Sequence, residues 1–264
     1  RVERVLLDPG EALTLLVGSG LAARSFQRLA SVDPGFDPTG VLSLRLSLPE
    51  LRYESDESRL QFHRQLLERL TALPGATAVG AVSDLPLGGS LSGTGASLEG
   101  QPLEDDGFPP IFMTKNVSSG YFDAMGIEIV EGRGFERLDA DRAAPVVIVS
   151  EGLARTHWAN ESALGKGIRQ GGPPGDGEDW FRVVGVVQDV HQQSLHDPPP
   201  ELAYYPLATP AGEGEIDVSL GMSYVVRAEG ANVASAARAA VRALDPRLPI
   251  SDVDTMETLV VRAR

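Results

Sequence analysis

Apolar and polar residues alternate over residues 41–48, and this period of two predicts a half-buried β-strand. A helical pattern follows, and Ser55 stands where a helix N-cap is favoured, with two acidic residues after it. The residues on the apolar face of this helix are Leu60, His63, Leu66, Leu67, Leu70 and Leu73. A Pro-Gly pair ends the helix, and residues 76–82 return as a strand. The pattern therefore predicts a strand–helix–strand unit.

A second unit of the same kind is predicted near the end of the chain. Residues 223–228 and 248–256 read as strands, and Asn232 is the candidate N-cap of the helix between them. One side of that helix carries Val233, Ala236, Ala237, Ala240, Val241 and Leu244. Two such units can combine into a ferredoxin-like sandwich, with both helices on one face of a sheet. We therefore predict an α+β fold in which the middle of the chain is inserted between the two units.

The middle of the chain, residues 116–208, predicts a smaller α/β unit. A short helix, Tyr121–Met125, is expected to end at Gly126, because glycine takes the left-handed position after a helix at low cost. Short apolar runs predict strands over residues 127–130, 145–150 and 181–190. Ser150 is a candidate cap for a helix over residues 151–158. Nothing in this unit has the pattern of a catalytic site, and we interpret it as a unit built for packing.

Two stretches, residues 83–110 and 170–179, are rich in Gly and Pro with acidic residues, and are interpreted as polar loops. Residues 12–23 are apolar, but a stretch of this length is shorter than the roughly 20 residues that cross a bilayer. A last helix is expected to start near Thr255. We expect the two ends of the domain to lie close together on one side.

The overall charge limits the possible partners. The chain has 264 residues, of which 23 are Lys or Arg and 37 are Asp or Glu, so its net charge is −14. A protein this acidic repels nucleic acid and anionic lipid surfaces. The chain has no cysteine, which excludes disulfides, thiolate catalysis and zinc sites that use cysteine.

One motif points to nucleotide binding. Gly18, Gly20 and Ala23 follow an apolar run and fit the G-x-G-x-x-A turn of dinucleotide-binding folds. The acidic residue that should hold the ribose about 20 positions later is not at the right spacing, so a small-residue patch in a helix is the favoured interpretation. Gly165 and Lys166 resemble part of a phosphate loop, but no Ser or Thr follows them, and we reject that site.

Candidate metal ligands are also weak. Asp189, His191, His196 and Asp197 lie within nine residues, but the spacing of the two histidines puts them on different helical faces. A polar loop after a strand is favoured there. His63 and His157 are interpreted as packed or edge residues. The chain lacks the G-x-S-x-G and H-E-x-x-H motifs, so no enzyme activity is predicted.

Arg133 is the candidate for a fixed structural role. It follows Gly132 at the end of a predicted strand and is expected to pair with Asp139 or Asp141. We expect a surface ion pair that contributes at most about 1 kcal/mol to stability.

The order of these elements resembles one family. The segments YFDAMGIEIVEGRGF, VVIVSEGLARTHW, LGKGI and VVGVVQDV, in this order, are similar to the extracytoplasmic core domain of MacB/FtsX-type ABC transporter permeases, nearest the acidobacterial-type long permeases. The positions that carry the resemblance are Tyr121, Phe122, Met125, Gly126, Gly132, Arg133, Phe135, Gly165, Gly185 and Asp189. The resemblance implies a structural role for these residues and no catalytic, cofactor or metal site.

The resemblance also implies a division of the chain. The expected parts are a membrane-proximal stalk helix (1–35), a porter-like subdomain (36–115 and 209–256), a small inserted subdomain (116–208) and a helix returning to the membrane (257–264). The implied domain is periplasmic, belongs to an inner-membrane permease and needs no cofactor. Its implied partners are a second permease copy, a cytoplasmic ATPase that hydrolyses ATP, and an adaptor or envelope protein.

The implied function is to transmit ATP-driven motion outward for export or for handling of envelope substrates. Two alternatives stay open: a soluble nucleotide-dependent enzyme that uses Gly18, Gly20 and Ala23, and a stand-alone ligand-binding or sensor domain. We expect the isolated domain to be a monomer, because the membrane part would hold two copies together.

Overall fold

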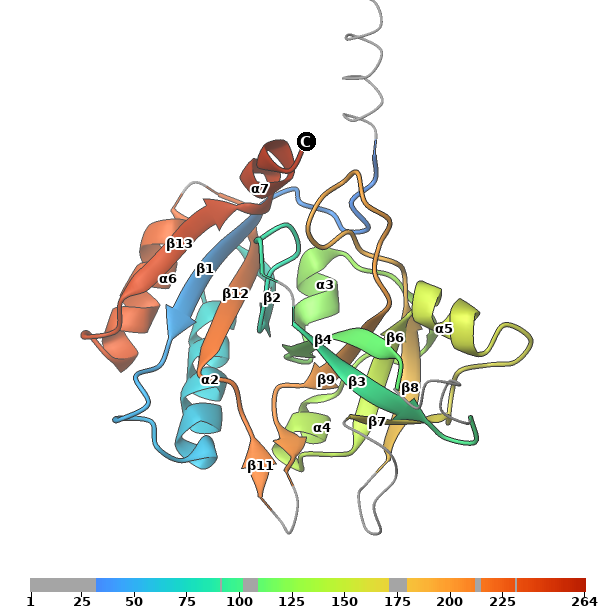
Figure 1. The fold of residues 1–264 in the computed structure, drawn as a ribbon. Coiled ribbons are helices and arrows are strands. Elements are labelled where there is room, and N and C mark those ends of the chain that lie inside the picture. Colours follow the sequence, from blue (N-terminus) through green and yellow to red (C-terminus); the bar gives the residue numbers. More distant parts are fainter. Residues whose placement is uncertain (1–31, 91, 102–108, 171–179, 212–214, 231) are drawn as a thin grey trace, which may run out of the picture.

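The computed structural model describes residues 32–90, 92–101, 109–170, 180–211, 215–230 and 232–264, and these form two halves that lie side by side (Figure 1). The first half contains both predicted strand–helix–strand units. Its elements are β1 (Val41–Ser47), α2 (Asp56–Thr71), β2 (Ala76–Val82), β12 (Gly221–Ala228), α6 (Val233–Leu244) and β13 (Ile250–Thr255). The predicted element types are confirmed, with boundaries that differ by a few residues.

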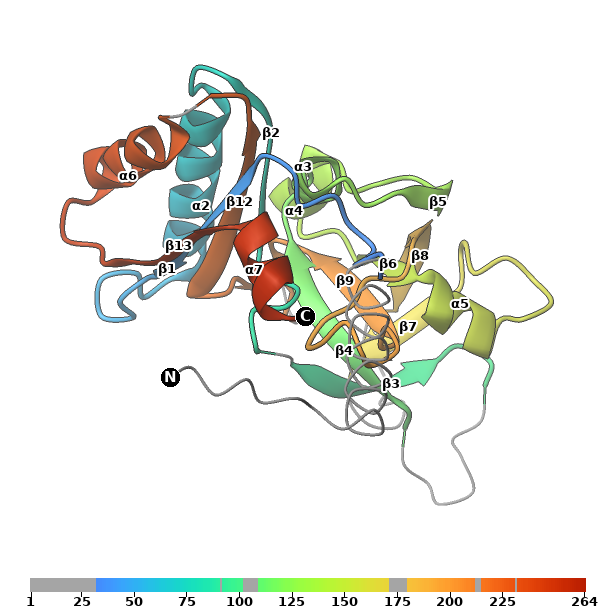
Figure 2. The same ribbon diagram turned by 90° about the horizontal axis from the view of Figure 1, so that it is seen from above.

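The strand order in the first half is β13-β1-β12-β2, and all three pairings are antiparallel. This is the order of a ferredoxin-like sheet, in which the first strand of each unit lies in the middle. Helices α2 and α6 cover one face (Figure 2). They pack on Leu44, Tyr224 and other apolar residues of that face, because alternate residues of a strand point to the same side.

Local signals explain where the helices of the first half begin and end. The Ser55 side chain accepts a hydrogen bond from the Ser58 backbone amide and caps α2, as predicted. Asn232 stands at the N-cap position of α6, but its side chain makes no capping hydrogen bond. After β13, the Thr255 side chain caps α7 (Met256–Arg262), the last predicted helix.

The second half is a closed ring of strands. Its strands are β3 (Gly93–Leu98), β4 (Ile111–Val117), β6 (Val146–Ser150), β7 (Gly167–Gln170), β8 (Phe181–Val187) and β9 (Leu202–Pro206). They pair in the order β4-β3-β7-β8-β6-β9, and β9 then pairs with β4 to close the ring. Alternation along β6 and β9 sends Val147, Val149, Ala203 and Tyr205 into one apolar cluster. A closed ring leaves no free strand edge within itself.

Four further elements complete the second half. These are α3 (Tyr121–Met125), β5 (Ile129–Gly132), α4 (Arg137–Asp141) and α5 (Glu151–His157). The predicted helices α3 and α5 are present, and the Ser150 side chain caps α5 as expected. A separate short hairpin joins β10 (Thr209–Pro210) to β11 (Ile216–Asp217).

The prediction of a polar loop over residues 83–110 is wrong in part. This stretch contains β3, whose Ala96 and Leu98 are buried in the core of the ring. The prediction failed because β3 becomes buried only through pairing with β4 and β7, which lie elsewhere in the sequence. Strands β4, β7 and β9 and helix α4 were not predicted either.

The backbone link between the two sheets is narrow. Strands β2 and β4 pair through a single residue pair, Val82 and Val117. Beside it, the Ser118 amide donates to the Ala81 carbonyl at 2.9 Å, and the Ala81 amide donates to the Ser118 hydroxyl at 2.9 Å. The two halves are therefore held together mainly by side chains.

Candidate functional site

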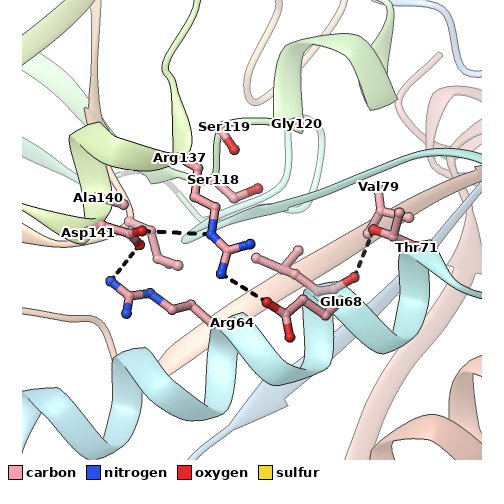
Figure 3. A pocket seen from close by; sticks show the side chains of 12 residues that line it. Arg64, Glu68, Thr71, Val79, Ser118, Ser119, Gly120, Arg137, Ala140 and Asp141 are labelled. Atoms are coloured by element: carbon pink, nitrogen blue, oxygen red, sulfur yellow. Dashed lines mark hydrogen bonds and ion pairs between the residues drawn. The ribbon is translucent and has the colours of Figure 1, made fainter.

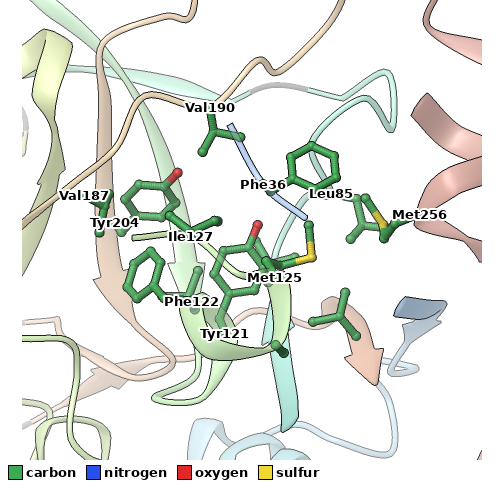
Figure 4. Packing of buried hydrophobic residues seen from close by; sticks show 14 of the residues in the cluster. Phe36, Leu85, Tyr121, Phe122, Met125, Ile127, Val187, Val190, Tyr204 and Met256 are labelled. Atoms are coloured by element: carbon green, nitrogen blue, oxygen red, sulfur yellow. The ribbon is translucent and has the colours of Figure 1, made fainter. Parts of the chain in front are cut away.

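The two halves meet in an apolar cluster, called here the junction core (Figure 4). Helix α3 supplies Tyr121, Phe122 and Met125, each at most 2% exposed. The segment before β1 supplies Phe36, and α7 supplies Met256. Helix α3 thus packs where the halves meet, and Phe36 before β1 and Met256 of the last helix pack into the same core.

Arg227 of β12 joins three parts of the junction. Its guanidinium donates to the Asp37 carboxylate at 2.8 Å and to the carbonyls of Asp37 and Thr39 at 2.8 and 2.9 Å. Its Nε donates to the Ala124 carbonyl of α3 at 3.1 Å. The Asp37 amide in turn donates to the Met125 carbonyl at 2.9 Å. Residues 32–39, called here the leading segment, are thus bonded to both halves.

The predicted glycines serve turns and close contacts. Gly126 ends α3 with φ of 63°, in the left-handed region, as expected. Gly132 and Gly165 also have positive φ, each of 78°. Gly185 has another role: a Cβ there would lie 2.2 Å from the Arg133 carbonyl oxygen. It therefore lets β8 approach the residue that follows β5.

Arg133 pairs with Asp139, which is one of its two predicted partners. The two hydrogen bonds are 2.7 and 3.2 Å long. Burial acts to raise the pKa of Asp139, but the hydrogen bonds from Arg133 and from the Glu136 amide outweigh it and lower the pKa. The expectation of a surface pair is wrong for Asp139, which is 7% exposed and takes part in the capping box of α4. Arg133 thereby fixes helix α4.

The other predicted partner of Arg133 faces a cleft between the two halves. Asp141 on α4 lies 2.6 Å from Arg64 on α2. Arg137, also on α4, lies 3.0 Å from Glu68 and 3.7 Å from Asp141 (Figure 3). Four charges thus alternate in sign across the cleft, and they join the ferredoxin-like half to the ring.

This inter-half cleft has a volume of about 390 Å³. It is lined by Arg64, Leu67, Glu68, Thr71, Val79, Ser118, Ser119, Gly120, Arg137, Ala140, Asp141 and Leu207. Apolar side chains line part of it, and the charged groups lie together beside them (Figure 3). A cleft of this size and mixed lining is within the range of small-molecule sites.

A second cleft, of about 350 Å³, lies between β1, α7 and the loop after β2. Beside that loop, Lys115 of β4 is only 1% exposed and donates to the Asp84 backbone carbonyl. Burial lowers the pKa of Lys115 from 10.5 to about 7, and the nearby Asp84 charge opposes this shift. A buried ammonium is costly unless it is paired, and Lys115 is a buried lysine whose ammonium contacts a backbone carbonyl.

The polar residues after β8 do not gather around one point. Asp189 accepts from the Gly152 amide at 2.7 Å and pairs with Arg155 at 3.2 Å, so it anchors α5. His191 and His196 bond instead to Ser194. Within the described ranges, no three His, Asp or Glu side chains are placed to hold a metal ion.

The remaining histidines are held by neighbours. His63 is buried, its Nδ1 accepts from the Tyr224 hydroxyl at 2.5 Å, and its Nε2 donates to the Ser219 carbonyl at 2.9 Å. Burial lowers the pKa of His63 to about 4. His157 contacts Glu201 at 3.0 Å. The predicted packing role of His63 is confirmed.

Some predictions lie outside the described residues. These are the stalk helix up to residue 31, the turn with Gly18, Gly20 and Ala23, and residues 171–179 of the second polar stretch. In the part of the chain that the structure does describe, no helix is both long enough and apolar enough to span a bilayer.

Sequence reasoning missed the cleft and the buried lysine. Arg64 and Arg137 lie on helices far apart in the sequence, and no local pattern indicates that they face one cleft. Lys115 stands between polar residues, so its burial has no local signal either. Two of the cleft residues were named from the sequence, but for other roles: Asp141 as a partner of Arg133 and Leu67 on the apolar face of a helix.

Comparisons with known proteins point in one direction. The family of MacB-like periplasmic core domains matches residues 12–244. The structure is similar to the crystal structure of the periplasmic region of MacB from Actinobacillus actinomycetemcomitans, with a TM-score of 0.55 and 17% identity. That match covers 89% of this chain and 97% of the other, and it shows a shared fold.

Two curated relatives match over shorter stretches. The macrolide export ATP-binding/permease protein MacB of Aggregatibacter actinomycetemcomitans is 34% identical over 28% of this chain and 10% of its own length. The uncharacterized ABC transporter permease YvrN of Bacillus subtilis (strain 168) is 31% identical over 34% of this chain and 20% of its own length. The matched segments therefore span a fifth or less of these relatives.

Proposed function

Because the chain belongs to the family of MacB-like periplasmic core domains, and so is an extracytoplasmic domain of an ABC transporter permease, we propose that it transmits ATP-driven motion outward from the membrane. One observation carries this proposal: the leading segment and α7 pack into the junction core, where both halves of the domain meet. A displacement of either segment would therefore act on both halves at once.

The contacts between the chain just before β1 and α7, the segments proposed to face the membrane, support a mechanical role. The Gly40 amide donates to the Glu257 carboxylate of α7 at 2.8 Å, so the leading segment and the last helix are joined directly. Both lie on one side of the domain (Figure 1), and Figure 2 shows α7 between the two halves. Packed cores do not deform continuously, so motion entering at this end reaches the far end.

We also propose that the domain consists of a porter-like subdomain (36–115 and 209–256) and an inserted subdomain (116–208). The core that packs α2 and α6 on the first sheet and the core of the ring support this division. One boundary is moved in this proposal: strands β3 and β4 pair within the ring, so residues 93–115 are assigned to the inserted subdomain instead of the porter-like one. Residues 1–35 and 257–264 are proposed to lead to the membrane.

In this proposal the domain itself catalyses no reaction. ATP is hydrolysed on a cytoplasmic ATPase domain or subunit, and a second permease copy stands opposite this one in the inner membrane. An adaptor or envelope protein is the proposed partner on the periplasmic side, and the outcome is efflux or handling of an envelope substrate. The family match supports this assignment of roles.

Location is tested with a single introduced thiol. Ser92 is exposed and the chain has no cysteine, so Ser92→Cys introduces a single thiol into this domain. The substitution is made in the full-length protein, from which any cysteines outside this domain have first been removed. A membrane-impermeant maleimide is expected to label it in spheroplasts with an intact inner membrane. Ser43→Cys, at a position with no exposed surface, is the matched control and should label only after denaturation. Labelling of Ser92→Cys only after lysis would contradict the proposal.

Coupling to ATP is tested with the same thiol. Spin labels on Ser92→Cys in two copies of the permease are expected to give a distance distribution that shifts when ATP is added. A variant of the ATPase that binds ATP without hydrolysing it separates the effects of binding and hydrolysis. An identical distribution in every nucleotide state would sink the coupling proposal and leave the location intact.

A further inference from the structure

The inter-half cleft combines apolar side chains with guanidinium groups that have donors to spare. Both carboxylates of the cleft already face arginines: Asp141 faces Arg64 and Arg137, and Glu68 faces Arg137. The buried Nε of Arg64 has no hydrogen-bond partner among the described residues. A buried donor without an acceptor is unfavourable. A ligand that fits the cleft should therefore supply a hydrogen-bond acceptor and not a positive charge.

The apolar part of the cleft lies next to these donors. Leu67 of α2, Val79 of β2 and Leu207 after β9 line it, and Leu207 is only 2% exposed. The cleft is lined by α2 and β2 of one half and by α4 of the other, and the shared junction core holds those halves together. The cleft is therefore preformed, which reduces the entropy that a ligand would lose on binding.

We propose that the inter-half cleft binds a small amphipathic anion. The apolar body of the ligand packs on Leu67, Val79 and Leu207, and its acidic group accepts hydrogen bonds from Arg64 and Arg137. Arginine suits this role because its planar group keeps several donors available while it stays paired with a carboxylate. The proposal is independent of ATP-driven motion, since it concerns only this domain.

The second cleft is a useful contrast. Its lining combines Leu85, Leu87 and Leu259 with Ser43, Ser90, Ser223, Arg45 and Asp84. Arg45 there donates to the Ser83 carbonyl at 3.2 Å and lies 3.7 Å from Asp84, and unlike Arg64 it has no buried nitrogen without a hydrogen-bond partner among the described residues. No ligand of the same class is expected to bind there, so one molecule should bind per chain.

The test uses the 264-residue chain and the fluorescent probe anilinonaphthalene sulfonate, which has an aromatic body and one acidic group. Saturable binding of one molecule per chain is expected, with a dissociation constant on the order of tens of micromolar. Decanoate and naphthoate are then added as competitors, which separates an aliphatic ligand from an aromatic one. Displacement by either one supports the proposal, and displacement by neither contradicts it.

Two sets of variants locate the site. Thr71→Trp places a large ring on an exposed position of the cleft wall and should abolish binding, whereas Thr77→Trp, at an exposed position outside the cleft, should not. Arg64→Gln with Arg137→Gln should weaken binding by about tenfold or more, because charge-assisted hydrogen bonds are lost. Arg155→Gln with Arg262→Gln removes two charges that lie outside this cleft and should change the affinity less than about twofold.

The same variants define the results that would overturn the proposal. Circular dichroism first confirms that each variant is folded, and the exposed Thr71 position keeps at least one variant informative. If Thr71→Trp and the double arginine variant both bind the probe as the original chain does, the probe binds elsewhere and the proposal fails. Absence of saturable binding to the unaltered chain overturns it as well.

Discussion

At the scale of single residues, Gly185 shows how a backbone contact depends on a missing side chain. We expect Gly185→Ala to lower the free energy of unfolding by about 2–3 kcal/mol, because its Cβ would meet the Arg133 carbonyl oxygen at 2.2 Å. Gly134→Ala is the matched control: a Cβ there would meet its nearest atom at 3.8 Å, and neither glycine has a positive φ. Urea unfolding measures both. Equal effects of the two substitutions would refute the steric explanation.

Lys115 gives a prediction about pH. In the unfolded chain it holds its proton up to a pKa of 10.5, whereas burial makes the folded protein release it near pH 7. Between these values the unfolded state binds more protons, so this group makes stability rise with pH, by at most about 1.4 kcal/mol per pH unit. Below about pH 7 both states hold the proton, and the cost of burying the ammonium is at its full size.

Replacing Lys115 by Met should remove this pH dependence and raise stability most on the acidic side. Urea unfolding between about pH 6 and about pH 9.5 measures the slope, because the groups that release protons at higher pH are then avoided. Lys166→Met is the control, since Lys166 is the other lysine of the chain and pairs at the surface with Glu161 at 2.6 Å. A slope that survives in Lys115→Met would show that another group causes it.

The residues that could be predicted are those with local signals. Tyr121–Met125 and Gly126 were found because a helix of this length with a glycine after it has few other interpretations. The burial of Lys115 could not be predicted, because it depends on β4 pairing with β9, whose residues are about ninety positions away.

At the scale of elements, Arg227 holds β12, α3 and the leading segment together. We expect Arg227→Lys to lower the free energy of unfolding by about 1–2 kcal/mol, because lysine keeps the charge but cannot donate to Asp37, Thr39 and Ala124 at once. Hydrogen exchange at the Asp37 amide, which bonds to Met125, should quicken. Arg262→Lys alters a single exposed pair with Asp254 and should change stability by less than about 0.5 kcal/mol. Unchanged exchange at Asp37 would argue against this role.

The elements that could be predicted are those whose pattern is local. Helix α2 and strand β1 show clear periods of burial and were placed to within a residue or two. Strands β3 and β7 are short and become buried only when the ring closes. The inter-half cleft has the same origin, because α2 and α4 meet through the fold and not through sequence.

At the scale of the whole molecule, the question is whether the two halves behave as one body. The strand pairing between the two halves is one residue pair, which by itself would allow movement. The junction core argues the other way, since it unites residues of both halves with the leading segment and α7. Apolar burial on this scale outweighs exposed ion pairs such as that between Arg137 and Glu68.

We therefore expect the two halves to unfold in a single transition, and the chain offers two separate reporters. Both tryptophans, Trp158 and Trp180, lie in the half that contains the ring, so their fluorescence follows that half. The two longest helices of the described residues, α2 and α6, are 16 and 12 residues long and belong to the other half, so the far-ultraviolet dichroism reports on that half. Coincident urea midpoints are expected, because loss of either half exposes the junction core of both.

A substitution inside the junction core makes this test stricter. Met125→Ala is expected to lower the free energy of unfolding by about 2–5 kcal/mol, because Met125 is fully buried where the halves meet. Both urea midpoints should therefore fall together. Leu153→Ala, in the core of the ring, is the control and should also move both midpoints if the halves are coupled. A fluorescence midpoint that falls while the dichroism midpoint stays would mean that the halves are independent. In that case motion from α7 would reach the ring only through the narrow link between β2 and β4.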